Sequence, residues 1–226
     1  MRYIFSMYKG LCAVYKPKGI TSYDVIREIK KHVQGEKIGH AGTLDPLAEG
    51  VLVIAIGREA TKHIADTVAK EKEYIAEVKL GVESATDDEE GEKTIFDVAH
   101  IPDKEIIEKV LASFIGTISQ TPPPYSAIKI DGKEAYKYMR ADKEVEMKPR
   151  EVIIKEIELL NYEWPILSLR VVTGPGVYIR SLARDIGRAL QTGGYLTGLV
   201  RTRVGDFALE NAIAFGELSL FLEKQI

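Results

Sequence analysis

Asp45 is the side chain whose setting in this sequence most favours chemistry. It lies in residues 39–50, where glycines and Pro46 surround one carboxylate. Gly42 permits backbone angles closed to other residues, while Pro46 fixes its own φ and favours an extended Asp45. Residues 51–56 are continuously apolar and predict a buried strand. A carboxylate on a rigid loop beside a core strand is well placed for chemistry. An Asp that hydrogen-bonds its own turn is an equally good interpretation.

Other side chains with reactive or metal-binding potential give weaker signals. Cys12 is the only cysteine, so no intramolecular disulfide can form, and its apolar neighbours indicate a small buried side chain rather than a reactive thiol. The four histidines lack the spacing of metal ligands, and one cysteine cannot complete a zinc site. We therefore expect no metal.

The charge pattern limits how the chain meets nucleic acid. The 226 residues are 45% hydrophobic and 29% charged, with a net charge of −3, which argues against a nucleic-acid binder that uses its whole surface. A local basic face remains open, and most of these cations are expected on solvated faces. The candidates are Lys16, Lys18, Arg27, Lys30, Lys31 and Lys37 early in the chain, and Arg180, Arg184 and Arg188 at a spacing of four. The acidic run at 87–92 is expected to be an exposed turn rather than a metal site.

No apolar run is long enough to span a bilayer, and residues 1–8 lack the apolar core of a signal peptide. We therefore expect a cytoplasmic protein that does not engage a membrane.

The first half of the chain must position the Asp45 loop. Residues 40–45 show neither a helical nor an alternating apolar period and predict a shaped loop. Thr21 or Ser22 is suited to cap a helix that continues to about His32. The other elements expected here are a strand at 10–15, a short helix at 59–68 and a strand at 74–80.

The second half alternates strand pairs and helices. Residues 121–150, rich in Lys and Tyr, contain three prolines and an Asp131–Gly132 turn signal, and we expect them to leave the main sheet. The other expected elements are a helix at 102–114 with Ile106, Val110 and Leu111 inward, strands at 152–162 and 166–173, a helix at 177–190, a strand region at 196–207 and a closing helix at 216–224. This order predicts an α+β fold with a mixed, largely antiparallel sheet flanked by helices, in one domain with an inserted segment.

Four motifs follow one another along the chain: Lys16-Pro17-x-Gly19-x-x-Ser22, Gly39-His40-x-Gly42-x-Leu44-Asp45-Pro46-x-Ala48-x-Gly50, Pro122-Pro123-x-Tyr125-Ser126-Ala127-x-Lys129 and Gly176-x-Tyr178-Ile179-Arg180-Ser181-Leu182. The combination of the second motif, around Asp45, with the fourth downstream is highly specific. In this order the motifs resemble those of the TruB family of tRNA pseudouridine synthases, and the resemblance extends over about residues 10–207.

The resemblance implies an isomerisation in which uracil leaves the ribose at N1, turns, and is reattached through C5, without a cofactor. It makes Asp45 the essential carboxylate, because breaking a glycosidic bond develops positive charge that a carboxylate can bond to, stabilise or relieve of a proton. It also implies that Arg180 pairs with Asp45 and keeps it ionised. Without the resemblance, Arg180 would be interpreted as a surface helix residue.

Three further site residues are implied by the same family. Tyr74 matches the tyrosine that stacks on the target base, and its hydroxyl is a candidate to help remove the C5 proton. Leu199 corresponds to a leucine that packs beside the base, and His40 to a histidine that fills the space the flipped base vacates. From spacing alone, Tyr74 and Leu199 would be core residues and His40 an ordinary loop histidine.

The family acts on a specific uridine in the T-loop of tRNA, which must be flipped out to reach a pocket. Residues 121–150 match its RNA-binding thumb, and we expect a monomer that binds the T-stem loop. Candidate stacking or phosphate-contacting residues in the thumb are Tyr125, Lys129, Lys133, Tyr136 and Arg140.

Bacterial relatives usually continue into a C-terminal RNA-binding PUA domain, which we do not expect in this chain; the catalytic domain is expected over 8–226. Two alternatives remain within RNA biology: a non-catalytic RNA-binding or RNA-folding protein, and a relative that depends on guide RNA and protein partners. A third alternative is a hydrolase that releases free base. Such enzymes commonly use a second carboxylate, and Glu49 is the only acid near Asp45 in the sequence.

Overall fold

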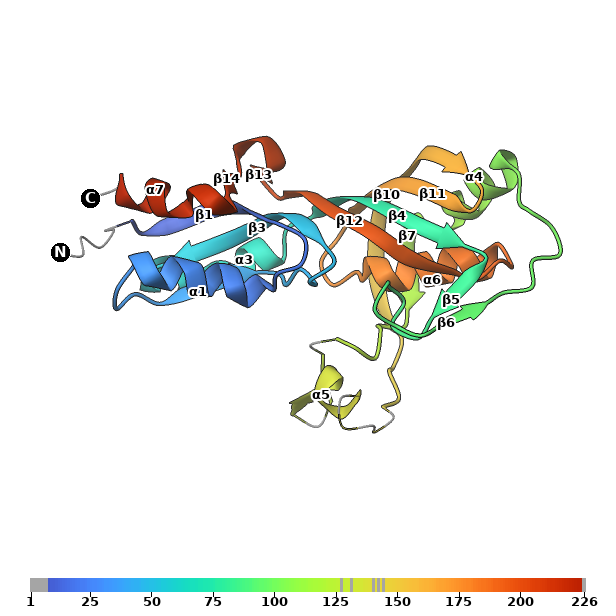
Figure 1. Cartoon of the computed structure of the whole chain (residues 1–226), viewed down its shortest axis with the longest axis horizontal. Helices are drawn as coiled ribbons and strands as arrows, with labels where there is room; N and C mark the ends of the chain where they lie inside the picture. Colours follow the sequence, from blue (N-terminus) through green and yellow to red (C-terminus); the bar gives the residue numbers. More distant parts are fainter. Residues whose placement is uncertain are drawn as a thin grey trace. The chain divides into compact units, whose positions relative to one another are not determined.

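The computed structural model describes residues 8–126, 128–130, 132–139, 141, 143 and 145–224. These residues form two compact units, which share strands β4 (Lys72–Leu80) and β12 (Gly194–Val204). The first unit contains residues 1–75 and 199–226, and the second contains residues 76–198. Figure 1 labels most of their elements. None of the helices among the described residues combines the length and apolar content needed to cross a membrane.

The first unit is built on strand β3 (Glu49–Ile56), whose side chains are almost all buried. Strand β1 (Gly10–Lys16) pairs with β3 in antiparallel register from Gly10–Ile56 to Lys16–Gly50, and β2 (Ile38–Ala41) pairs with β3 as well. Strand β12 is parallel to β3, with Arg201 opposite Gly50. The other elements are α2 (Arg58–Lys62), α3 (Ile64–Val68), β13 (Phe207–Ala208), β14 (Ile213–Ala214), two 3₁₀ turns (Leu209–Asn211 and Phe215–Glu217) and α7 (Leu218–Glu223).

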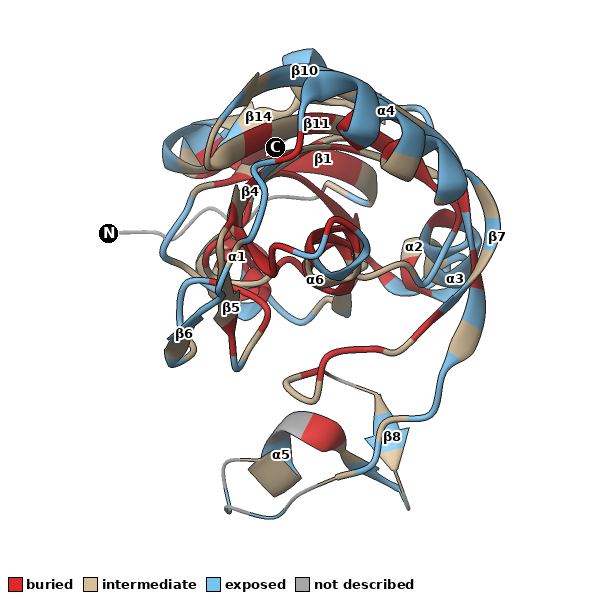
Figure 2. Cartoon of the chain, turned by 90° about the vertical axis from the view of Figure 1, so that its right-hand side faces the viewer, coloured by how far each residue is buried: buried red, intermediate tan, exposed pale blue. Residues whose placement is uncertain are grey.

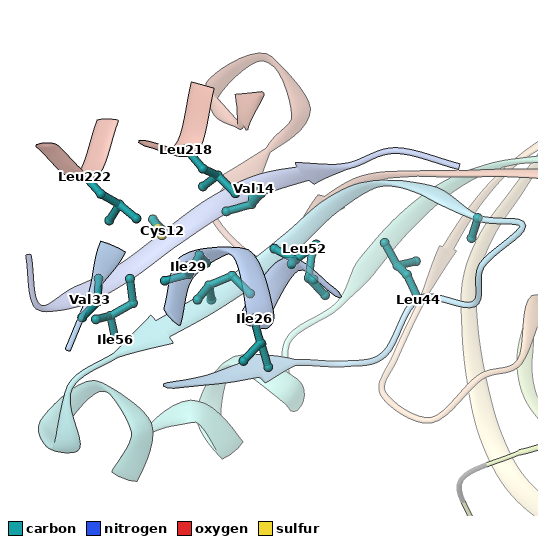
Figure 3. Close-up of a cluster of buried hydrophobic side chains, with 13 residues drawn as sticks. Cys12, Val14, Ile26, Ile29, Val33, Leu44, Leu52, Ile56, Leu218 and Leu222 are labelled. Atoms are coloured by element: carbon teal, nitrogen blue, oxygen red, sulfur yellow. The ribbon is translucent and has the colours of Figure 1, made fainter. Parts of the chain in front are cut away.

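Helix α1 (Ser22–His32) begins where its capping chemistry predicts. The Thr21 side chain accepts a hydrogen bond from the Asp24 backbone N–H, and the Asp24 side chain accepts one from the Thr21 N–H, which completes a capping box. Its apolar face packs with α7 and β3 in the core shown in Figure 3. Cys12 is buried in this core, as predicted, and burial raises the pKa of its thiol to about 12.

The second unit contains the sheet order β12-β4-β11-β10-β7, in which β10 (Arg150–Glu163) is antiparallel to both β11 (Ile166–Thr173) and β7 (Gly116–Gln120). Helix α6 (Ile179–Ala189) is buried along most of its length, whereas α4 (Lys104–Ser113) exposes its outer side (Figure 2). Small pairs are formed by β5 (Val82–Ser84) with β6 (Lys93–Ile95) and by β8 (Lys129–Ile130) with β9 (Lys133–Glu134), followed by α5 (Ala135–Met139).

The predicted α+β fold with a large, mixed and mostly antiparallel sheet is confirmed. So is the hairpin around Gly132, although Asp131 lies outside the described residues. Three local predictions were wrong. His40 lies in β2 rather than in the loop, because pairing with Ile54 of β3 makes it a strand residue. The helix expected at 59–68 is divided in two at His63. In α4 the buried residues are Ile107 and Leu111, so the prediction was right for Leu111 and wrong for Ile106, which is 49% exposed.

Candidate active site

The Asp45 loop is fixed in place by backbone and core contacts of the first unit. It connects β2 to β3 and lies against the start of α1, where the Ser22 hydroxyl donates to the carbonyl of Leu44 (3.0 Å) and accepts from its N–H (2.9 Å). The Ala48 N–H donates to the Asp45 carbonyl (3.1 Å), which closes a turn through the backbone. Leu44 and Ala48 are buried, whereas Asp45 is half-buried. The loop therefore holds its carboxylate at the edge of the core.

Arg201 is the buried cation beside this loop, and the sequence analysis assigned it no role. Its side chain is 1% exposed, and its Nε donates to the carbonyl of Val51 (2.7 Å) while Nη2 donates to that of Gly42 (3.0 Å). Burial lowers the pKa of its guanidinium, and its interactions with Tyr74 and Asp45 act in the opposite direction. The signal in the sequence was an arginine inside a long strand pattern, adjacent to Leu199.

The positions of Tyr74 and Leu199 are compatible with contact to a base and also with an ordinary role in the core. Tyr74 is buried in β4, and its hydroxyl forms a hydrogen bond with the side chain of Arg201. Leu199 is partly buried on β12 and packs against the core that contains Leu44 and Leu52. The predicted contacts of these two side chains with a base stay predictions.

His40 lies on β2, half-buried in the first unit. Burial lowers the pKa of its imidazole, and the positive charge of Arg201 lowers it further, so the neutral form is favoured at pH 7. Its buried Nδ1 has no hydrogen-bond partner within the part of the chain that the structure describes. The predicted role of His40 as a space-filling residue stays a prediction.

Lys16 and Lys72 add two more buried cations near Arg201. Lys16 donates to the carbonyls of Pro17 (2.9 Å) and Ile20 (2.7 Å), and Lys72 donates to those of Val68 (2.7 Å) and Lys70 (2.6 Å). Burial lowers the pKa of each ammonium to about 8, although Asp45 and Glu49 oppose this for Lys16. The expectation of solvated faces is thus wrong for Lys16, whereas the other five early cations are exposed.

Arg180 lies in the second unit, where it belongs to an internal ionic network. Its Nη1 is 3.2 Å from Oδ2 of Asp88, and its Nη2 donates to the carbonyl of Tyr125 (3.0 Å). Arg184 forms a second buried pair with Asp87 (2.7 Å), while Arg188 is an exposed partner of Glu83. The predicted pair between Arg180 and Asp45 stays a prediction.

The acidic run at 87–92 is not simply the exposed turn that the sequence suggested. Asp87 and Asp88 are buried because α6 supplies arginines to both, and only the following residues reach solvent. Burial raises the pKa of Asp87 to about 6, against the opposing effects of Arg184 and Arg180. A pocket of about 550 Å³ borders this network, lined by Asp87, Arg184, Asp185 and Arg188 together with hydroxyl-bearing residues.

No group of three or more His, Cys, Asp and Glu side chains among the described residues is arranged to hold a metal ion. Among the five residues of 121–150 that were predicted to contact RNA, Tyr125, Lys129 and Lys133 lie in described positions, whereas Arg140 and the side chain of Tyr136 lie outside the described residues.

Comparison with known proteins is consistent with this arrangement. Residues 30–179 match the family described as TruB family pseudouridylate synthase (N terminal domain). A Bacteroides fragilis protein named tRNA pseudouridine synthase B is 45% identical over 217 residues, covering 93% of this chain and 92% of the relative. A protein of the same name from Clostridium kluyveri is 42% identical over 91% of this chain and 70% of its own length.

Among solved structures, one chain in the crystal structure of a Cbf5-Nop10-Gar1 complex matches 94% of this chain with a TM-score of 0.71 and 33% identity. This chain spans 54% of that one. The family match covers residues 30–179, the Bacteroides fragilis relative matches over nearly its whole length, and the solved structure has the same fold. This chain therefore belongs to the TruB family of pseudouridylate synthases.

Proposed function

We propose that this chain isomerises uridine in tRNA to pseudouridine and that Asp45 is its essential carboxylate. The observation that carries the assignment of Asp45 is its position on a loop anchored by Ser22 and faced by buried cations. The tRNA substrate is supported by the names of the relatives from Bacteroides fragilis and Clostridium kluyveri.

The charges around Asp45 suit a reaction that breaks a glycosidic bond. Lys16 and Arg201 are electrostatic neighbours of Asp45, and cations favour the ionised form of a carboxylate. An ionised carboxylate can bond to the sugar as positive charge develops on it, stabilise that charge, or accept a proton. Tyr74 would stack on the detached base, with its hydroxyl oriented by Arg201.

The specific substrate we propose is a uridine in the T-loop of tRNA. Such a base must leave the stack before Asp45 can reach its ribose, and flipping costs a few kcal/mol that protein contacts have to return. In the thumb, Lys129 and Lys133 are exposed cations on the β8–β9 pair and are suited to phosphate contacts. The site is complete in one copy in this proposal, so the enzyme acts as a monomer.

The test uses an unmodified tRNA transcript that carries tritium at uracil C5, incubated with the chain alone. The wild type is expected to release tritium while the RNA stays intact, and Asp45→Asn is expected to release none. Asp66→Asn is the matched control, because Asp66 is an exposed carboxylate of the same unit and should leave the rate unchanged. Retained activity in Asp45→Asn would refute the catalytic assignment, and free uracil would indicate a hydrolase.

A guide-dependent mode of action is the second candidate, because a structure of an H/ACA RNP bound to a substrate RNA matches 96% of this chain with a TM-score of 0.69 and 30% identity. The same assay separates the two. Tritium release by the chain alone supports the stand-alone enzyme, whereas tight tRNA binding without release would support dependence on a guide or partner, or a non-catalytic binding protein.

A further inference from the structure

Arg201 ties together three segments that are distant in sequence. Its guanidinium reaches the carbonyl of Gly42 in the Asp45 loop, the carbonyl of Val51 in β3 and the hydroxyl of Tyr74 in β4. Two of these partners belong to segments that carry the predicted site residues Asp45 and Tyr74. A guanidinium presents its donors in a fixed planar fork, so its contacts constrain one another in direction as well as in distance.

The backbone of Arg201 lies in close contact with β3. Gly50 lies opposite Arg201 with a φ of +105°, and a Cβ at Gly50 would lie 2.3 Å from the Arg201 carbonyl oxygen. Gly42, with a φ of +80°, faces the guanidinium at ordinary van der Waals distance, since an added Cβ would be 3.5 Å from Arg201 Nη1. Gly50 therefore lets β3 and β12 approach each other closely, which fixes the backbone position from which the Arg201 side chain projects.

Burying the Arg201 charge costs free energy that an apolar residue linking the same strands would not cost. Its charge acts on Lys16, Lys72 and His40 and lowers the pKa of each, so several buried cationic groups share one region. Desolvating such charges costs several kcal/mol each, and apolar side chains of similar volume would fill the space without that cost. Retaining a charge here has a direct benefit for a reaction that needs an ionised Asp45 and an oriented Tyr74.

We infer that Arg201 is a positioning residue for the reaction: through Gly42 it sets the Asp45 loop, and through its bond to the Tyr74 hydroxyl it sets the direction of that phenol. The Tyr74 hydroxyl has one proton, and because Arg201 is a donor only, that proton must point away from the guanidinium. The contact with Arg201 therefore restricts the direction in which the phenol can donate its proton. This inference rests on the proposed function.

The experiment measures the single-turnover rate of pseudouridine formation in a tRNA transcript at saturating enzyme, together with the Kd for the transcript and the Tm. Arg201→Lys keeps the charge but loses the fork, and we expect a rate about 100-fold lower with a Kd within about 2-fold, since small misplacements of reacting groups have effects of this size. Arg203→Lys is the matched control, because Arg203 is two residues along the same strand and pairs with Glu71 at 2.7 Å. Its rate should stay within about 2-fold of the wild type.

A double-mutant cycle with Tyr74→Phe distinguishes positioning from a general loss of structure. If Arg201 acts through the Tyr74 hydroxyl, the double variant will lose at least about 3-fold less rate than the product of the two single losses. Losses that multiply, or a normal rate in Arg201→Lys, would overturn the inference. Should Arg201→Lys fail to fold, Tyr74→Phe alone decides. It tests the part of the inference that involves the Tyr74 hydroxyl: a loss of at least about 10-fold in rate with a Kd within about 2-fold of the wild type is expected, and a wild-type rate would overturn the inference.

The parallel wild-type reaction separates this inference from the proposed function. If the wild type forms no pseudouridine, the proposed function is refuted and the role of Arg201 falls with it. The other case is an active wild type and an inactive Asp45→Asn variant. If Arg201→Lys then has a normal rate, or the rate losses in the double-mutant cycle multiply, the proposed function stands and the Arg201 inference alone is refuted.

Discussion

Buried positive charges have different partners in the two units. In the first unit, the Lys16 and Lys72 ammonium groups donate to backbone carbonyls, and Arg201 donates to two more. In the second unit, Arg180 and Arg184 pair with the carboxylates of Asp88 and Asp87. Carbonyl partners satisfy a cation without neutralising it, so Lys16 and Arg201 keep the charges that act on Asp45. Ion pairs cancel the charge and serve as structural links.

In the first unit, Gly50→Ala should cause the largest loss of stability. The Arg201 side chain can reach its carbonyl partners only if the backbones of β3 and β12 approach closely at Gly50. The added Cβ would lie 2.3 Å from the Arg201 carbonyl oxygen at a φ of +105°, where side chains are strained. We expect a loss of about 4 kcal/mol or more in the free energy of unfolding, measured by urea denaturation. Gly216→Ala, which meets open space, should change it by less than about 1 kcal/mol. Equal effects would refute the close-packing argument.

In the second unit, Arg184→Met should be the more harmful of two arginine changes on α6. It leaves Asp87 buried without its guanidinium partner at 2.7 Å, which typically costs about 3–5 kcal/mol. Arg188→Met removes an exposed pair with Glu83, and exposed pairs contribute at most about 1 kcal/mol. Thermal and urea unfolding of the two variants would measure the difference. A similar small effect of both would show that the Asp87 pair is not a structural link.

The contribution of Asp87 to stability should change with pH between about 4 and 6. Its folded pKa of about 6 lies above its ordinary value of 3.8, so the folded state binds more protons than the unfolded state between these values. The contribution of Asp87 to the free energy of unfolding is therefore greatest below pH 4 and falls as pH rises to about 6, by at most roughly 3 kcal/mol.

Urea denaturation of the wild type and Asp87→Asn at pH 4.5 and pH 7 isolates this effect, because the other carboxylates titrate in both proteins. The variant should lose less stability than the wild type, or gain more, as pH rises between these points. Identical pH dependence in the two proteins would contradict the raised pKa.

The smallest of these effects is expected at alkaline pH, where Lys16 of the first unit loses its proton. The folded pKa of Lys16 is about 8, below its ordinary 10.5, so its charge beside Asp45 is lost as pH rises above 8. We expect the single-turnover rate to fall several-fold between pH 7.5 and 9.5, with a shallower fall in Lys16→Met. Over the same range the unfolded state binds more protons, so the contribution of Lys16 to the free energy of unfolding rises. A rate profile unchanged by Lys16→Met would contradict this role.

Local sequence patterns predicted several elements correctly. Thr21 and the apolar positions Val25, Ile26 and Ile29 defined α1, since a cap and a helical period act within a few residues. The continuous apolar run at 51–56 identified the buried strand β3. The motif around Asp45, followed downstream by the motif around Arg180, pointed to the family by resemblance, while the glycines and proline near Asp45 predicted a shaped loop.

What the sequence determined by itself was therefore the α+β plan, the loop that carries Asp45 and the family. Only the tertiary structure decided which charges are buried. Lys16 and Asp87 were expected at the surface, and Arg201 was assigned nothing, yet all three are buried. For Arg201 and Asp87 the partners come from other segments: Arg201 reaches Gly42, 159 residues away, and Arg184 reaches Asp87, 97 residues away. Lys16 donates to the nearby carbonyls of Pro17 and Ile20, but its strand β1 lies between β3 and β14 in the sheet. Such meetings of distant segments leave no local pattern in the sequence.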